Sequence, residues 1–62
     1  MARNYSLDDQ IRCVQREIAM RRRVFPKRVA QEAMKSEEAD WQIECMEAVL
    51  ATLEEKAGRR LL

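Results

Sequence analysis

Apolar residues between Ala39 and Ala57 recur at the spacing of one face of a helix. Successive members of the set are 4, 3, 4, 3 and 4 residues apart, which is the heptad pattern of a helix that packs along a single seam. The set comprises Ala39, Ile43, Met46, Leu50, Leu53 and Ala57. The pattern predicts a helix over about residues 37–57, with Ser36 as its candidate N-cap and Gly58 as the left-handed residue that ends it.

The first part of the chain carries a matching seam, which predicts another long helix over about residues 7–25. Its apolar members are Leu7, Ile11, Val14, Ile18 and Phe25. The basic Arg21 takes the remaining place, and Ser6 is the candidate N-cap. We expect Pro26 to end or kink this helix, because proline lacks an amide hydrogen and its ring clashes with the preceding turn. The same proline suits the start of a new helix, which predicts a short helix over about residues 26–34.

Two long helices with a short segment between them predict an all-α fold. We expect an antiparallel, coiled-coil-like helical hairpin with the short helix at its joint. Facing seams would place Ile18 near Ile43 and would bring Arg22 close enough to Asp40 for an ion pair. The 62 residues make a single domain over 1–62. A chain of this length buries too little surface to be very stable alone, so a stabilising partner is expected.

The positions beside the two seams differ between the two flanks of the hairpin. One flank is charged, whereas the other carries apolar and small residues with the only tryptophan at its edge. We expect this second flank to be the self-association or partner face, and its members are Cys13, Met20, Val24, Trp41, Cys45, Val49 and Thr52. Because a single hairpin would leave this flank in water, the pattern predicts a homodimer in which two hairpins form a four-helix bundle. An unknown protein partner is the alternative occupant.

Three residues of that flank have more than one interpretation. Trp41 either covers the joint and the edge of the dimer or acts as a hot spot for a partner. Cys13 and Cys45 are too far apart for a disulfide within one hairpin. We interpret both cysteines as small buried apolar residues, with a contact across the dimer or a redox switch as the alternative.

The residue types of the chain argue against catalysis. There is no histidine, which removes the commonest general base and the commonest metal ligand. The few hydroxyl groups form no nucleophile–base set, and the acidic pair Glu44 and Glu47 is interpreted as a solvated helix face. We therefore expect no enzyme, no catalytic residues, no metal and no cofactor.

Charge is distributed unevenly along the chain. Residues 1–35 hold nine Lys or Arg and four Asp or Glu, a net +5, whereas residues 36–62 hold three and seven, a net −4. The basic cluster comprises Arg21, Arg22, Arg23, Lys27 and Arg28. We expect it to pair with the acidic start of the second long helix and to complement a helix end; contact with phosphates, and hence nucleic acid, is the alternative. The absence of a signal peptide and of a long apolar run predicts a cytoplasmic protein with no membrane association.

Residues 14–55 contain the strings EIAMRRRVFPKRVAQEAM and ADWQIECMEAVLATLEE. An arginine run that meets an aromatic–proline pair, followed by a basic segment and an acidic helix start, resembles a group of small uncharacterised proteins of proteobacterial phages and prophages. The matching residues are Met20, Arg21, Arg22, Arg23, Val24, Phe25, Pro26, Val29, Ala39, Asp40, Ile43, Met46, Glu47, Ala48, Val49 and Leu50.

The chain departs from that group at two places in the segment between its long helices. Gln31, Glu32 and Ala33 stand where a glycine is expected, and the position before Val29 is the basic Arg28. The resemblance implies a phage or prophage origin and the cytoplasm of a bacterial host. It implies no particular activity.

Overall fold

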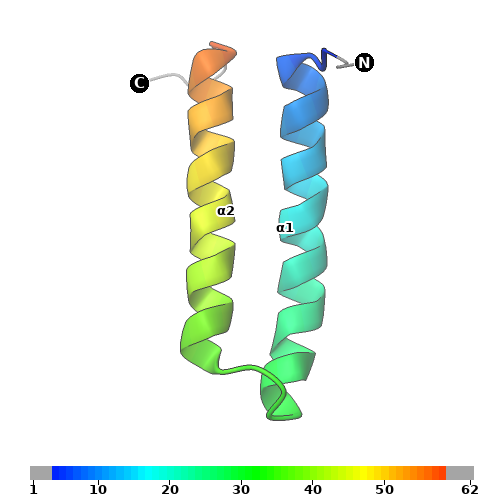
Figure 1. Cartoon of the computed structure of the whole chain (residues 1–62), viewed down its shortest axis with the longest axis vertical. Helices are drawn as coiled ribbons and strands as arrows, with labels where there is room; N and C mark the ends of the chain where they lie inside the picture. Colours follow the sequence, from blue (N-terminus) through cyan, green and yellow to red (C-terminus); the bar gives the residue numbers. More distant parts are fainter. Residues whose placement is uncertain (1–3, 59–62) are drawn as a thin grey trace.

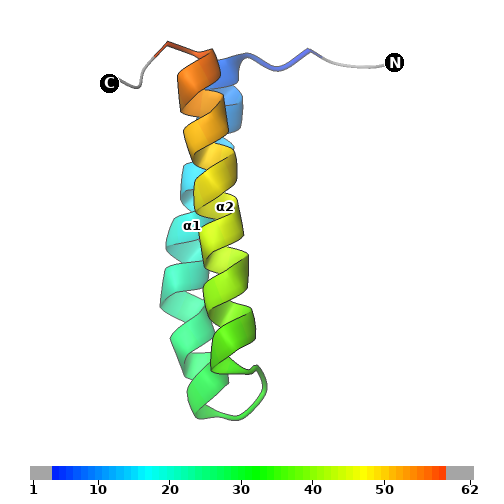
Figure 2. The ribbon, with the colours of Figure 1, turned by 90° about the vertical axis from the view of Figure 1, so that its left-hand side faces the viewer.

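The computed structural model describes residues 4–58, and this part of the chain folds into two helices without a strand. Helix α1 spans Leu7–Ala30 and helix α2 spans Ser36–Lys56. The helices lie side by side and antiparallel, with the joint at one end and the described ends of the chain at the other (Figure 1). In the view turned by 90°, α2 lies in front of α1 along the length of the hairpin (Figure 2). The predicted all-α helical hairpin is therefore confirmed.

The start of α1 follows the capping chemistry that the sequence predicts. Ser6 has an extended backbone, and its hydroxyl oxygen accepts a hydrogen bond from the amide of Asp9 at 3.0 Å. Asp8 and Asp9 occupy the first turn, where negative charge favours the positive end of the helix dipole. Ser6 therefore satisfies one of the amides that an uncapped helix leaves without a partner.

The structure differs from the prediction at Pro26, because α1 continues through this proline to Ala30. The described residues contain no separate helix over 26–34, and residues 31–35 form the joint instead. A proline inside a helix costs about 3 kcal/mol. Burial offsets this cost, since Phe25 is 7% exposed and Val29 is half-buried one turn later. The ring of Pro26 itself is exposed.

The joint begins with hydrogen bonds that close the C-terminus of α1. The amide of Glu32 donates to the carbonyl of Val29 at 3.0 Å, and the amide of Ala33 donates to the carbonyl of Arg28 at 2.9 Å. Both bonds together form a Schellman motif, which needs a left-handed residue just after the helix. Glu32 takes that place with a φ of 59°, so a glutamate stands where glycine is favoured.

The predicted end residues of α2 are confirmed at its C-terminus but not at its N-terminus. The helix begins at Ser36, and Lys35 occupies the N-cap position without a side-chain hydrogen bond. Ser36 is thus the first helical residue and not the cap that its type suggests. At the other end, Gly58 has a φ of 73° and its amide donates to the carbonyl of Glu55 at 3.0 Å, which confirms it as the left-handed stop.

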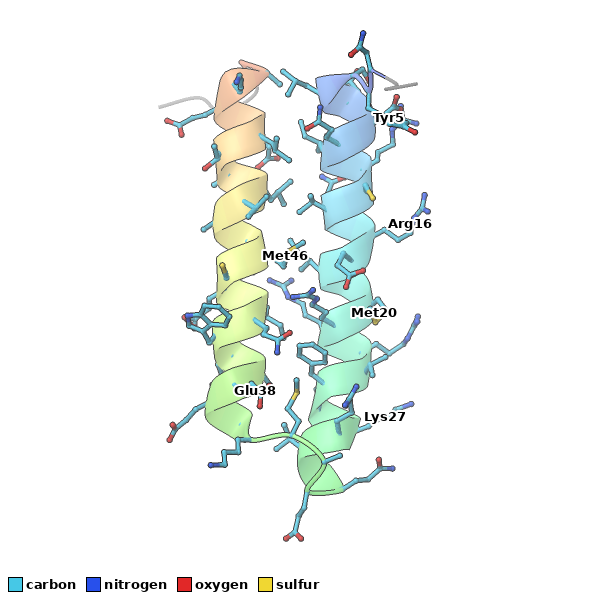
Figure 3. All side chains as sticks on the ribbon, in the orientation of Figure 1. Tyr5, Arg16, Met20, Lys27, Glu38 and Met46 are labelled. Carbon is cyan, nitrogen blue, oxygen red and sulfur yellow. The ribbon has the colours of Figure 1, made fainter. Side chains whose placement is uncertain are left out.

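The core is a single seam between the helices. Its buried members on α1 are Ile11, Ile18 and Phe25, which expose 1%, 6% and 7% of their surface and are spaced seven residues apart. Ala39 is the buried member on α2. The half-buried members are Leu7, Val14, Val29, Ile43, Met46, Leu50, Leu53 and Ala57. Met46 points into the space between the helices (Figure 3), so the seam follows the predicted heptads.

The register of the two helices is displaced from the prediction. Ile18 lines a shallow hollow together with Leu50, and Phe25 lines another with Ala39 and Ile43. Ile18 therefore does not face Ile43. The physical reason is the extra turn of α1 beyond Pro26, which moves the joint, and with it every facing pair, toward the C-terminus.

Candidate interaction surfaces

Arg21 joins the two helices on one flank of the seam. Its Nε lies 2.9 Å from a carboxylate oxygen of Glu17, and its Nη1 donates to the backbone carbonyl of Gln42 at 3.3 Å. The guanidinium carbon also lies 5.8 Å from the ring centre of Phe25, within the range of a cation–π contact. The basic residue that interrupts the apolar seam of α1 therefore contributes to packing, with its side chain 22% exposed.

A polar chain crosses this flank from one helix to the other. The side-chain amide of Gln42 donates to a carboxylate oxygen of Glu38 at 3.3 Å, which extends the contacts of Glu17 and Arg21. By heptad position, Glu17 and Gln42 belong to the flank that the sequence assigned to self-association.

The opposite flank is joined by an ion pair between Arg22 and Glu47. These residues hold equivalent heptad positions on the two helices, which agrees with the charged character predicted for this flank. The sequence predicts an ion pair between Arg22 and Asp40. This prediction is wrong, because Arg22 pairs with Glu47 instead. The displaced register accounts for the change, since it brings residues nearer the middle of α2 level with Arg22.

The residues predicted to form the association face are mostly exposed. On α1, Cys13 is exposed whereas Met20 and Val24 are half-buried, and Met20 lies on the side of α1 that faces away from α2 (Figure 3). On α2, Trp41 is 67% exposed and Val49 is 41% exposed. Cys45 and Thr52 are exposed as well.

The exposed residues of α2 form a second apolar face, which we call the α2 outer stripe. It consists of Trp41, Cys45, Ala48, Val49 and Thr52, all of them exposed. Four members are 4, 3 and 4 residues apart, the same steps as in the buried seam but on the opposite side of the helix. The hydroxyl of Thr52 donates to the carbonyl of Ala48 at 3.1 Å, so it needs no partner outside the helix. Ala48 is not among the residues predicted for the association face, although its spacing from Cys45 and Thr52 points to it.

Both cysteines are exposed free thiols. Neither cysteine is buried within the hairpin, because the helix faces that carry them point away from the seam. A contact between copies or a redox role stays a prediction. Among residues 4–58, no group of three or more His, Cys, Asp or Glu side chains is placed to hold a metal ion.

The basic cluster divides into two parts with different environments. Arg21 and Arg22 are engaged with Glu17 and Glu47, so their partners are not the acidic first turn of α2 that the sequence suggested. The exposed members are Arg23, Lys27 and Arg28, and they form no ion pair with any residue between 4 and 58. Lys27 and Arg28 lie in the last turn of α1, where cations favour the helix dipole.

The outward side of α1 carries a row of cations, which we call the α1 basic stripe. It consists of Arg12, Arg16, Arg23 and Lys27, all exposed and spaced by 4, 7 and 4 residues. Arg16 and Lys27 lie on the side of α1 away from α2 (Figure 3). Arg12 also lies 3.6 Å from a carboxylate oxygen of Asp9, a contact of little strength at the surface. Arg12 and Arg16 lie outside the predicted basic cluster, because that cluster groups cations by adjacency in the chain and not by helical face.

The outward side of α2 carries charge of the opposite sign beside its apolar stripe. We call this set the α2 acidic row, and it consists of Glu37, Asp40, Glu44 and Glu55, all exposed. The first three are spaced by 3 and 4 residues, and the fourth follows after 11, so they share one side of the helix. The hairpin therefore presents a basic outer surface on one helix and an acidic, apolar outer surface on the other.

No protein-family model, curated protein or solved structure matches the chain. No helix in the described part of the chain is long and apolar enough to cross a membrane.

Proposed function

We propose that this protein is a non-enzymatic interaction protein that associates with further copies of itself through its outward helix faces. The observation that carries the proposal is the α2 outer stripe, in which Trp41 and Val49 remain 67% and 41% exposed. Exposed tryptophan is enriched among residues that dominate the energy of protein interfaces. A contiguous apolar face on a chain of 62 residues is more typical of an interface than of a free surface.

The size of the hairpin supports the same proposal. A chain of this length buries only about 60% of the surface that its unfolded form exposes, and small domains of this kind gain stability from disulfides, metals or association. Cys13 and Cys45 are free thiols. Association of copies supplies the missing burial, and the homodimer closed into a four-helix bundle that the sequence predicts is one form that it can take.

The setting of the proposed function follows from the sequence resemblance alone. Residues 14–55 resemble small proteins of proteobacterial phages and prophages, so we propose a phage-derived protein that works in the cytoplasm of a bacterial host. The absence of histidine from the chain supports a role without catalysis.

Nucleic-acid association is the second candidate function. The observation that favours it is that Arg23, Lys27 and Arg28 are exposed without an ion pair to any described residue, since exposed cations on one helix can neutralise phosphates. Arg21 and Arg22 are engaged within the hairpin. Self-association is better supported, because it also explains the apolar face of α2.

Sedimentation velocity over a wide range of protein concentration tests the proposal. We expect the wild-type protein to associate, and we expect Trp41→Lys with Val49→Lys to remain monomeric because lysine cannot be buried without a partner. The matched control is Ala19→Lys with Gln31→Lys, which adds the same charge at exposed positions outside the α2 outer stripe.

The control variant should associate like the wild type. A wild-type protein that stays monomeric at every concentration would rule out self-association. Repeating the runs at low salt with duplex DNA tests the second candidate, since co-sedimentation of DNA with a monomeric protein would favour nucleic-acid binding.

A further inference from the structure

We propose that copies of this chain associate side by side, with the outer face of α1 on one copy packed antiparallel against the outer face of α2 on the next. This inference rests on the proposed self-association and names its geometry. It replaces the closed four-helix bundle with a contact between two different surfaces.

The flank used by the closed bundle carries a polar chain of contacts beside its apolar residues, which disfavours packing a second hairpin there. Glu17, Arg21, Gln42 and Glu38 form a continuous chain of contacts across it, with donor–acceptor distances from 2.9 to 3.3 Å. Packing a second hairpin on this flank would remove those charged groups from water, which is costly without new partners. The outward faces of the two helices carry no such chain of contacts between helices.

The two outward faces are complementary in charge and in apolar character. Each residue of a helix is rotated by about 100° around the helix axis from the one before it. Going around the axis of α1 in this sense, the basic stripe comes first and is followed by the apolar residues Met20, Cys13 and Val24. Going around the axis of α2 in the same sense, the acidic row comes first and is followed by the α2 outer stripe. Antiparallel helices place equivalent flanks against each other. The basic stripe therefore meets the acidic row, and the apolar halves meet on the other side.

The opposite charges of the two outward faces also lie at matching heights along the helix axes. Within the hairpin, Ile18 lies beside Leu50, and Phe25 lies beside Ala39 and Ile43. A copy displaced sideways, with no shift along the helix axes, preserves these levels. Three pairs of opposite charge then face each other: Arg12 with Glu55, Arg23 with Glu44, and Lys27 with Asp40.

The alternative pairing of two α2 helices lacks this complementarity. An antiparallel pair of identical helices would place the acidic row of one copy against the acidic row of the other, which is unfavourable. The side-by-side contact is also heterologous, because it joins two different surfaces. A row of copies therefore always has an uncovered α1 outer face at one end and an uncovered α2 outer face at the other. Association of this type does not close at two copies and grows with concentration unless the rotation between copies forms a ring.

Charge reversal on each face tests the proposed geometry by sedimentation velocity at low salt. One variant carries Arg12→Glu and Arg23→Glu on α1, and the other carries Glu44→Lys and Glu55→Lys on α2. We expect each variant alone to be monomeric and an equimolar mixture to associate, because each variant then finds an oppositely charged face on the other. Arg12→Lys with Arg23→Lys preserves the charge and should associate like the wild type.

The outcomes separate the geometry from the proposed function. If the wild type associates and the α1 reversal leaves that association unchanged, the side-by-side contact is overturned while self-association stands. A mixture that stays monomeric would also overturn it, provided that circular dichroism shows both variants to be helical. If the wild type is monomeric at every concentration, the proposed function itself fails.

Discussion

Among residues 4–58, Glu32 is the non-glycine residue with a left-handed backbone conformation. Its φ of 59° lies in the left-handed region, where a side chain with a Cβ costs about 1–2 kcal/mol. The conformation persists because the amides of Glu32 and Ala33 close the end of α1 through the carbonyls of Val29 and Arg28. The joint therefore stores strain that a glycine would remove.

Replacing Glu32 by glycine should stabilise the hairpin by about 1 kcal/mol, because glycine adopts the left-handed conformation without steric cost. Urea unfolding followed by circular dichroism measures the change in the free energy of unfolding. The matched control is Gln31→Gly, where φ is −87° and glycine relieves nothing. Equal effects at the two positions would contradict the left-handed joint.

At the scale of the elements, the unusual feature is a helix that runs through its own proline. Pro26 lies inside α1 with four helical residues after it, so the carbonyl of Arg22 lacks its usual backbone donor. The neighbouring Phe25 is buried at the seam, which favours the helical path. The length of α1 then sets the joint and the register of the whole hairpin.

Replacing Pro26 by alanine should stabilise the protein by up to about 3 kcal/mol, since alanine restores the hydrogen bond to Arg22 and has the highest helix propensity. Thermal and urea unfolding give the size of the change. Lys27→Ala at the next exposed position serves as the control and should change stability by less than about 0.5 kcal/mol. A proline variant no more stable than this control would show that α1 does not continue through residue 26.

The sequence predicts the two helices and their seam well, because both depend on spacing within one helix. Ile11, Ile18 and Phe25 are spaced by seven residues and are buried as expected. The prediction that the first helix ends at about residue 25 was wrong. Local propensity reflects the cost of Pro26 in a helix, but it contains nothing about the burial of Phe25, which favours the helical conformation. The ion pair of Arg22 was assigned to the wrong partner for a related reason, because the register depends on where the joint lies.

The candidate surfaces were predicted less completely than the fold. Trp41 and Val49 were assigned to the association face, and both are exposed. Grouping cations by adjacency placed Arg21 and Arg22 in a binding cluster, whereas the structure engages them in contacts with Glu17 and Glu47. Such contacts depend on the distance between helices, which the sequence of one helix does not contain.

At the scale of the whole molecule, the hairpin has one buried seam and two outward faces of opposite character. The α1 basic stripe and the α2 acidic row balance each other, so the net charge of +1 hides two strongly charged sides. The α2 outer stripe adds an apolar face that the seam does not use. This distribution is the basis for both the proposed self-association and its side-by-side geometry.

The most direct test of this account is the emission of Trp41, the only tryptophan of the chain, measured as a function of protein concentration. In a separate hairpin this side chain is 67% exposed and its emission is that of indole in water. If the α2 outer stripe is the interface, the emission maximum moves to shorter wavelength as concentration rises and the sedimenting mass increases. An emission maximum that stays at the position of exposed indole over the whole range would contradict the account.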